Sequence, residues 1–142
     1  MSNQKINSIL LLTARLTLFI LFFPAGLDKM IHFSSTVAYI NSVGLPFATI
    51  AAIGAIVIEI IGSILLLLGY KQRLVFPFFI IFTLLATLIF HNFWAFPVEM
   101  QKIQSLLFFK NLGVIGGMLA LFVASKQIDY FSLDSFKRKK QP

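Results

Sequence analysis

The sequence predicts an all-α integral membrane protein, a bundle of four transmembrane helices with both termini in the cytoplasm. Composition is the first observation: 58% of the 142 residues are hydrophobic and 12% are charged, whereas soluble domains carry about 25% charged residues. The second is that four long apolar segments account for nearly the whole chain. The third is an uneven distribution of basic residues between the connections. We therefore expect a single membrane domain over residues 1–142.

The first two predicted spans cover residues 8–27 and 47–69. The first contains Arg15 and follows a basic start, but it is too long for the apolar region of a signal peptide, so we expect a retained helix. The second is 23 residues long and has one charged residue, Glu59, at its middle. Such a length of apolar sequence is typical of a membrane-spanning helix. Residues 37–43, between the two spans, predict a short helix at the membrane surface.

The last two predicted spans cover residues 74–90 and 105–125. A short basic turn precedes the third span, and its brevity predicts that the second and third helices are antiparallel neighbours. The fourth span carries two polar residues, Lys110 and Asn111. A basic cytoplasmic tail over residues 126–142 completes the chain.

Basic residues concentrate on one side of this topology. Both termini and the turn between the second and third spans share that side, which carries eight Lys and Arg against two on the other. The positive-inside rule then predicts a multi-pass protein of the bacterial inner membrane with both termini in the cytoplasm. We expect the basic tail to rest on anionic lipid headgroups, although a plain topology signal explains the same charges.

Composition also excludes several classes of function. The net charge of +7 is explained by membrane topology, and no nucleic-acid recognition motif accompanies it. The chain has no cysteine, which excludes disulfides, thiol redox relays and iron–sulfur ligation by its own residues. His32 and His91 do not have metal-ligand spacing, so no metal site is expected.

Glu59 is the residue around which the sequence suggests a site. A carboxylate near the bilayer centre costs about 2.5–3.5 kcal/mol, so it should have partners. Arg15 and Lys110 lie at comparable predicted depth. The face of Lys110 also carries Gly113 and Gly117, a spacing that allows close helix approach, and small residues share the face of Glu59. We therefore expect the second and fourth helices to pack with their ions together in one Arg/Glu/Lys cluster.

This cluster predicts an opening toward the periplasm. Lys29 continues the face of Arg15 along the first helix, and His91 and Trp94 reach the same end from the third. Arg15 and Lys110 against the single carboxylate of Glu59 leave a surplus of positive charge. Asp28 or an anionic or carbonyl-bearing ligand would balance this surplus, unless Lys110 is neutral or extends its amine toward water. The alternatives are a buried ion network that only sets helix register, an interfacial aromatic belt that includes Trp94, and a helix-end role for His91.

At these residues the chain resembles the DoxX family of small four-helix membrane proteins, over roughly residues 8–125. The resemblance rests on the order and spacing of several short motifs. These are Arg15 with Gly26-Leu27-Asp28-Lys29, Glu59-Ile60-Ile61-Gly62, Gly69, Ala86-Thr87 before His91-Asn92-Phe93-Trp94, and Lys110-Asn111-Leu112-Gly113 with Gly116-Gly117. It implies the fold, and it implies site positions at Arg15, Lys29, Glu59, His91, Lys110 and Asn111.

The resemblance also implies a function. The family's best-defined members look like small subunits of a thiosulfate:quinone oxidoreductase, so a quinone held near the cluster and a soluble or membrane oxidoreductase partner are expected. No covalently bound cofactor is expected. Two other classes stay open: a small ion-coupled transporter, in which Glu59 carries a proton, and a non-catalytic structural or assembly subunit. A homo-oligomer is compatible with each.

Overall fold

The fold is all helical, as the sequence predicts. The structure, a computed structural model, describes residues 3–125 and 129–138, and within these ranges it contains helices and turns but no strand. In chain order the elements are α1 (Asn3–Ile31), α2 (Phe33–Ser42), α3 (Ala48–Val57), the π-helical segment η1 (Ile58–Gly62), α4 (Ser63–Leu68), α5 (Gln72–Phe90), the 3₁₀ turn η2 (Phe93–Ala95), α6 (Val98–Ala124) and α7 (Leu133–Arg138).

Four helical stretches are long and apolar enough to cross a membrane, which confirms the four predicted spans. They are α1, the continuous run α3–η1–α4, α5 with η2, and α6. Helix α6 begins at Val98, seven residues before the predicted start of its span. Pro97 precedes it with ψ 147°, and the Pro97 carbonyl accepts the N–H groups of Met100 and Gln101. Helix α2 confirms the short helix predicted between the first two spans, with an earlier start.

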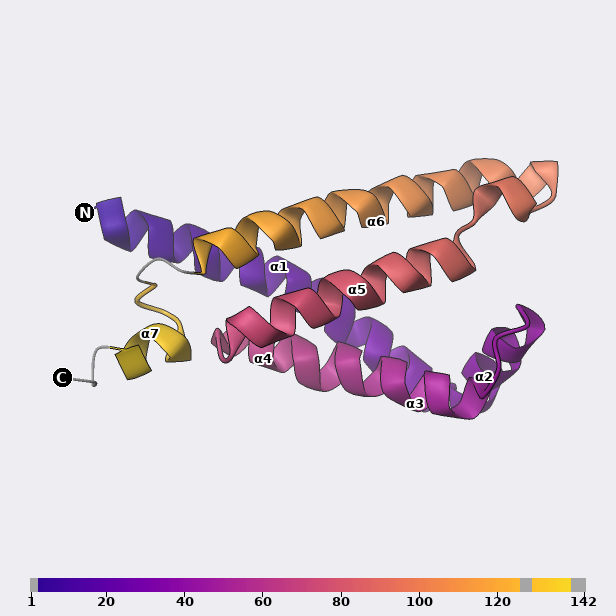
Figure 1. The fold of residues 1–142 in the computed structure, drawn as a ribbon, viewed down its shortest axis with the longest axis horizontal. Coiled ribbons are helices and arrows are strands. Elements are labelled where there is room, and N and C mark those ends of the chain that lie inside the picture. The colour runs from indigo at the N-terminus through magenta and orange to yellow at the C-terminus, as the bar shows by residue number, and fades with distance from the viewer. Residues whose placement is uncertain (1–2, 126–128, 139–142) are drawn as a thin grey trace.

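The helices form two antiparallel pairs, α1 with α3–η1–α4 and α5 with α6 (Figure 1). The start of α1, the α4–α5 turn and α7 lie at one end of the molecule, which we call the terminal end. Helix α2 and the turn η2 lie at the other, the loop end (Figure 1). The short α4–α5 turn makes the second and third spans neighbours, as expected.

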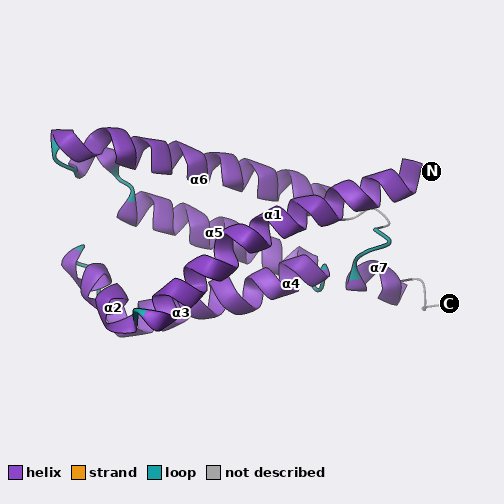
Figure 2. Ribbon diagram, turned by 180° about the vertical axis from the view of Figure 1, so that it is seen from behind, coloured by secondary structure: helices purple, strands orange, loops and turns teal. Residues whose placement is uncertain are grey.

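The apolar core lies toward the terminal end. Its buried side chains come from all four spans: Leu18, Phe22, Leu66, Val75, Phe76, Phe79 and Met118. The α5 members belong to the first half of that helix, next to the α4–α5 turn. Beyond this core the two helix pairs diverge toward the loop end (Figure 2). The divergence positions the polar groups described below.

The α4–α5 turn depends on Gly69. Its backbone is left-handed, with φ 62°, a conformation that favours glycine. The N–H groups of Gly69 and Tyr70 donate to the carbonyls of Leu66 and Leu65, both at 3.0 Å, which is the Schellman pattern that ends a helix. A Cβ on Gly69 would also run into the guanidinium of Arg15, so this turn is built for close approach of α1.

The C-terminal segment docks on the terminal end instead of lying free as a tail. The Asp134 carboxylate accepts the N–H groups of Lys71 and Gln72, both at 2.9 Å, and so caps the start of α5. The Asp134 N–H donates to the Gly69 carbonyl at 3.1 Å. The expectation that the basic tail rests on lipid headgroups stays a prediction, and the charged side chains of residues 137–140 lie outside the described residues.

Candidate functional site

Arg15 does not meet Glu59, and this part of the predicted cluster is wrong. The Arg15 side chain is 1% exposed and its Nη2 lies 3.0 Å from Asp129 Oδ2. The guanidinium also donates to the carbonyls of Leu67 (3.1 Å) and Phe131 (3.0 Å). The prediction failed because it compared depths along the spans, whereas the C-terminal segment folds back and brings an acid to Arg15 at the terminal end. The sequence did contain a signal for this pairing, because Asp129 and Asp134 are two acids within an otherwise basic tail.

Glu59 pairs instead with Lys29, near the end of α1. Lys29 Nζ lies 3.0 Å from Glu59 Oε1 and 2.8 Å from Oε2. The Glu59 side chain is 7% exposed and that of Lys29 is 31% exposed. A buried carboxylate needs a counter-charge, and Lys29 supplies it for Glu59. The sequence predicts Lys29 at the opening of the cluster and not in the ion pair.

Local geometry explains why these two residues meet. Glu59 lies in η1, where the wider π-helical turn interrupts the α-helix, a feature frequent at functional sites. A Cβ on Gly26 would lie 2.9 Å from Glu59 Cβ and 2.8 Å from Ile60 Cγ1. Only glycine therefore lets α1 approach η1 this closely, and Lys29 follows Gly26 by one helical turn on the same face.

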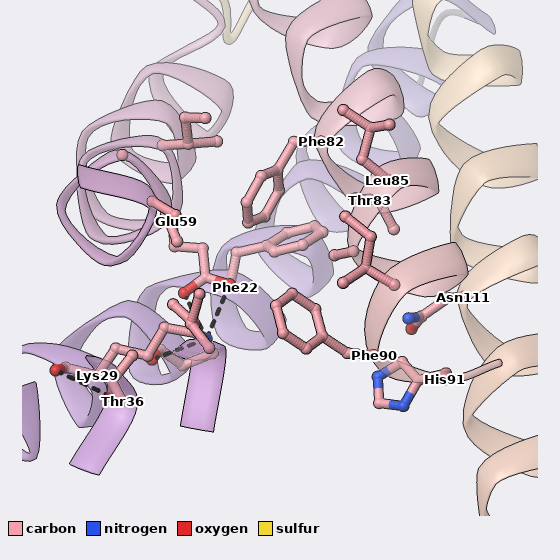
Figure 3. A pocket seen from close by; sticks show the side chains of 18 of the residues that line it. Phe22, Lys29, Thr36, Glu59, Phe82, Thr83, Leu85, Phe90, His91 and Asn111 are labelled. Atoms are coloured by element: carbon pink, nitrogen blue, oxygen red, sulfur yellow. Dashed lines mark hydrogen bonds and ion pairs between the residues drawn. The ribbon is translucent and has the colours of Figure 1, made fainter. Parts of the chain in front are cut away.

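The Lys29–Glu59 pair lies in the wall of a cavity of about 550 Å³. This volume is within the range of small-molecule sites, roughly 300–1,000 Å³. The cavity lies between the two diverging helix pairs, with Glu59 and Lys29 on one side and His91 and Asn111 on the other (Figure 3). Much of the remaining lining is apolar and aromatic, including Phe22, Phe82 and Phe90. Such a cavity suits a flat, largely apolar ligand with a few polar atoms.

The wall formed by α5 and α6 carries three of the predicted site residues. His91 Nδ1 lies 2.9 Å from Oε1 of Gln104, a buried residue that the sequence did not single out. Asn111 Nδ2 donates to Thr87 Oγ1 at 3.0 Å. Lys110 also lines the cavity but is exposed, and it has no ion-pair partner in the described part of the chain.

Helix α6 does not pack against the second span as the sequence suggested. It packs chiefly on α5, and the second span packs on α1. Within the described structure, nothing lies within 4 Å of where a Cβ on Gly113 or Gly117 would be. The predicted contact of these glycines with the face of Glu59 is therefore wrong, because Gly26 of α1 occupies that face.

Trp94 lies apart from the cavity lining. It is 59% exposed and its ring packs against Phe93 and Phe108, with centroids 5.1 and 5.7 Å apart. An exposed aromatic cluster at the loop end agrees with the interfacial belt, which stays a prediction. Asp28, proposed as a balancing acid, lies at the helix surface beside His32, with 3.0 Å between its Oδ1 and the imidazole Nδ1. Among the described residues there is no group of three or more His, Asp or Glu that would hold a metal ion.

Four spans and a largely apolar cavity with a few polar groups between them define a small multi-pass membrane protein with a candidate ligand site. The DoxX family matches residues 10–92, more than half of the chain, and the chain belongs to this family. It is 35% identical over 115 residues to inner membrane protein YphA of Escherichia coli strain K12, covering 81% of this chain and 82% of the relative. It is 31% identical to inner membrane protein YqjF of the same organism over 137 residues, 96% of this chain and 98% of the relative. No solved structure matches the chain.

Proposed function

We propose that this protein is a membrane subunit of a quinone-linked oxidoreductase and that the cavity beside Lys29 and Glu59 holds the quinone ring. The observation that carries the proposal is the cavity itself, about 550 Å³ of largely apolar space within the spans, with ionisable groups on two opposite walls. A quinone ring is flat and apolar and carries polar oxygens at two opposite positions. The DoxX resemblance to thiosulfate:quinone oxidoreductase subunits supports the same ligand.

The chain's own residues supply binding and protons in this proposal. Reduction of a quinone to a hydroquinone takes up two electrons and two protons. The sequence has no cysteine to hold an iron–sulfur or thiol redox centre, so the electrons come from an oxidoreductase partner. His91 lines the cavity, and His is the residue type that most often transfers protons in active sites.

The ion-coupled transporter is less well supported by the same geometry. A proton-carrying carboxylate works by alternating between its charged and neutral forms. Lys29 contacts both oxygens of Glu59, and a cation this close opposes protonation of the carboxylate. Glu59 in this setting suits a fixed binding group better than a mobile proton carrier.

A pair of cavity-filling substitutions tests the proposed ligand. Gly54 lines the cavity and Gly113 does not, and a Cβ on either would have nothing within 4 Å in the described structure. The protein is purified with native lipids in nanodiscs, and its quinone is extracted and quantified by chromatography. We expect wild type and Gly113→Leu to retain quinone, and Gly54→Leu to retain about tenfold less. Wild-type protein with no quinone above the lipid background, or equal retention by Gly54→Leu, contradicts the proposal.

We further propose that the terminal end faces the cytoplasm of a bacterial inner membrane, the location that the names of both relatives give for those proteins. Because the chain has no cysteine, single cysteines report this directly. Ser34, in α2 at the loop end, and Arg73, at the start of α5, are both exposed. A membrane-impermeant maleimide should label Ser34→Cys in intact cells and Arg73→Cys only after lysis. The reverse pattern overturns the orientation.

A further inference from the structure

Two opposite walls of the cavity each present an ionisable group that can offer a ligand only a hydrogen-bond acceptor, Glu59 on one wall and His91 on the other. This follows from the partners that each lining group already has, because a group whose N–H or O–H is spent within the protein can offer a ligand only its lone pairs. His91 meets this condition, and the Glu59 carboxylate has no N–H or O–H to donate. Together they define which form of a ring ligand the cavity accepts.

His91 offers an acceptor because Gln104 fixes its tautomer. The side-chain oxygen of Gln104 lies 2.9 Å from Nδ1 of His91 and, as a carbonyl oxygen, it can only accept. Nδ1 therefore carries the proton of the neutral imidazole, and Nε2 presents a lone pair. Gln104 is 8% exposed, so its amide is held within the protein. In the described part of the chain Nε2 has no partner.

Asn111 offers an acceptor because of a chain of two hydrogen bonds behind it. The Thr87 hydroxyl donates its single proton to the Thr83 carbonyl at 2.6 Å. It must then accept from Asn111, whose Nδ2 lies 3.0 Å away. This sets the orientation of the Asn111 amide and leaves Oδ1 and the second N–H of Nδ2 without a partner among the described residues. Thr87 is fully buried, which protects the arrangement from water.

The opposite wall also offers acceptors. The three N–H groups of Lys29 have three acceptors within reach, the two oxygens of Glu59 and the Ala25 carbonyl at 3.4 Å. Lys29 thus has no N–H left for a ligand, while each carboxylate oxygen of Glu59 retains a further lone pair. The buried hydroxyl of Thr83 has no partner in the described structure and is able to donate or accept. Lys110 and Tyr39 also line the cavity with groups that can donate, and both residues are exposed.

We infer that the cavity selects an aromatic ring bearing hydroxyl donors, and therefore binds the hydroquinone in preference to the quinone. This inference rests on the proposed function and names the redox form that the site favours. A quinone presents carbonyl oxygens, which are acceptors and would face the unpaired acceptors of His91 and Glu59. A hydroquinone presents an O–H at each of two opposite positions, one for each wall. A site built to bond a hydroxyl rejects the analogue that lacks it, because its buried polar groups are then left unpaired.

Binding of a matched redox pair tests this inference. The protein in nanodiscs is titrated anaerobically with decylubiquinol and with decylubiquinone, with calorimetric detection. We expect the dissociation constant of the quinol to be at least about tenfold lower, which for a two-electron couple raises the potential of the bound pair by about 30 mV. Equal binding, or tighter quinone binding, overturns the inference and leaves the proposed function standing. If neither form binds, the proposed function fails and the inference fails with it.

Variants of Gln104 separate tautomer control from a merely structural role. Gln104→Leu removes the acceptor at Nδ1 and should reduce the preference for quinol at least threefold. Gln104→Glu keeps an acceptor there and should preserve it. Nitrogen NMR of labelled histidine, assigned with His32→Gln and His91→Gln, should show Nδ1 protonated in wild type and Gln104→Glu but mixed tautomers in Gln104→Leu. A wild-type His91 protonated at Nε2, or a preference unchanged in Gln104→Leu with altered tautomers, overturns the proposed role of Gln104.

Discussion

Helix α1 carries two cations on one face, and each forms an ion pair of a different kind. Arg15 and Lys29 are separated by fourteen residues, or roughly 21 Å along the helix. The Arg15 and Asp129 side chains are 1% and 3% exposed, whereas Lys29 is 31% exposed beside Glu59 at 7%. Arg15 directs its donors to backbone carbonyls and one carboxylate, within the protein. The Lys29–Glu59 pair borders an open cavity.

This difference in surroundings indicates that the Arg15–Asp129 pair stabilises the fold, whereas the Lys29–Glu59 pair contributes to the candidate site. The Arg15–Asp129 pair holds the C-terminal segment against α1 and the α4–α5 turn, and no part of it is left for a ligand. The Lys29–Glu59 pair leaves lone pairs of Glu59 directed at a space that a ligand can enter. Both pairs satisfy the same electrostatic requirement of charges in an apolar medium, yet only the second one forms a candidate site.

The largest expected effect is the loss of Asp129. The Asp129→Asn substitution leaves the Arg15 guanidinium buried without a counter-charge, and breaking a buried pair from one side costs about 3–5 kcal/mol. We expect the free energy of unfolding, measured by denaturation in mixed micelles, to fall by that amount. Quinone retention by the folded fraction should stay unchanged. A loss below about 1 kcal/mol would contradict the role of this pair as the main clamp of the terminal end.

A methyl group at Gly26 should have the next largest effect. Its Cβ would lie 2.8–2.9 Å from atoms of Glu59 and Ile60, and overpacking of this kind costs about 1–3 kcal/mol. Gly26→Ala should therefore lower the unfolding free energy and also weaken quinone retention, because it separates Lys29 from Glu59. The matched control is Gly113→Ala, whose Cβ meets nothing within 4 Å in the described structure. Equal behaviour of the two variants would show that close approach of α1 and η1 is not required.

Removing the charge of Glu59 should have the opposite pattern of effects to Asp129→Asn, with a smaller loss of stability and a larger loss of bound quinone. Glu59→Gln leaves Lys29 without a counter-charge, but Lys29 is partly exposed and extends toward water. We expect a stability loss of about 1–2 kcal/mol, smaller than that of Asp129→Asn, with a clear loss of bound quinone. The two measurements on both variants sharpen the comparison. A Glu59→Gln protein as unstable as Asp129→Asn, with quinone retained, would identify the second pair as architectural too.

The smallest effect is expected at the exposed pair of Asp28 and His32. Their side chains are 73% and 62% exposed, and ion pairs in water contribute little. The Asp28→Asn substitution should change the unfolding free energy by less than about 0.5 kcal/mol. The same denaturation experiment measures it and provides the baseline for the other three. A larger change would show that the loop end depends on this contact.

Most of the candidate site could be predicted residue by residue, but not its pairings. Lys29, Glu59, His91, Lys110 and Asn111 all line the cavity. Each stood out as a polar residue inside or beside an apolar span, where polarity is expensive. Arg15 stood out for the same reason and proved to belong to the other end of the molecule. Gln104 was not identified, and Thr87 was named only as part of a family motif, because a neutral side chain near a helix end carries no comparable signal.

The sequence by itself determined the class of fold, the four spans and the need for counter-charges. The physical basis of these predictions is local. In lipid, the backbone N–H and C=O groups of a long apolar segment must be paired within the segment itself, so the segment forms a helix. The tertiary structure alone decided which acid forms an ion pair with which cation. That choice depends on Gly26, which brings α1 against η1, on the return of residues 129–136 to Arg15, and on a core at one end only. These features depend on contacts between distant parts of the chain, which hydropathy and spacing do not encode.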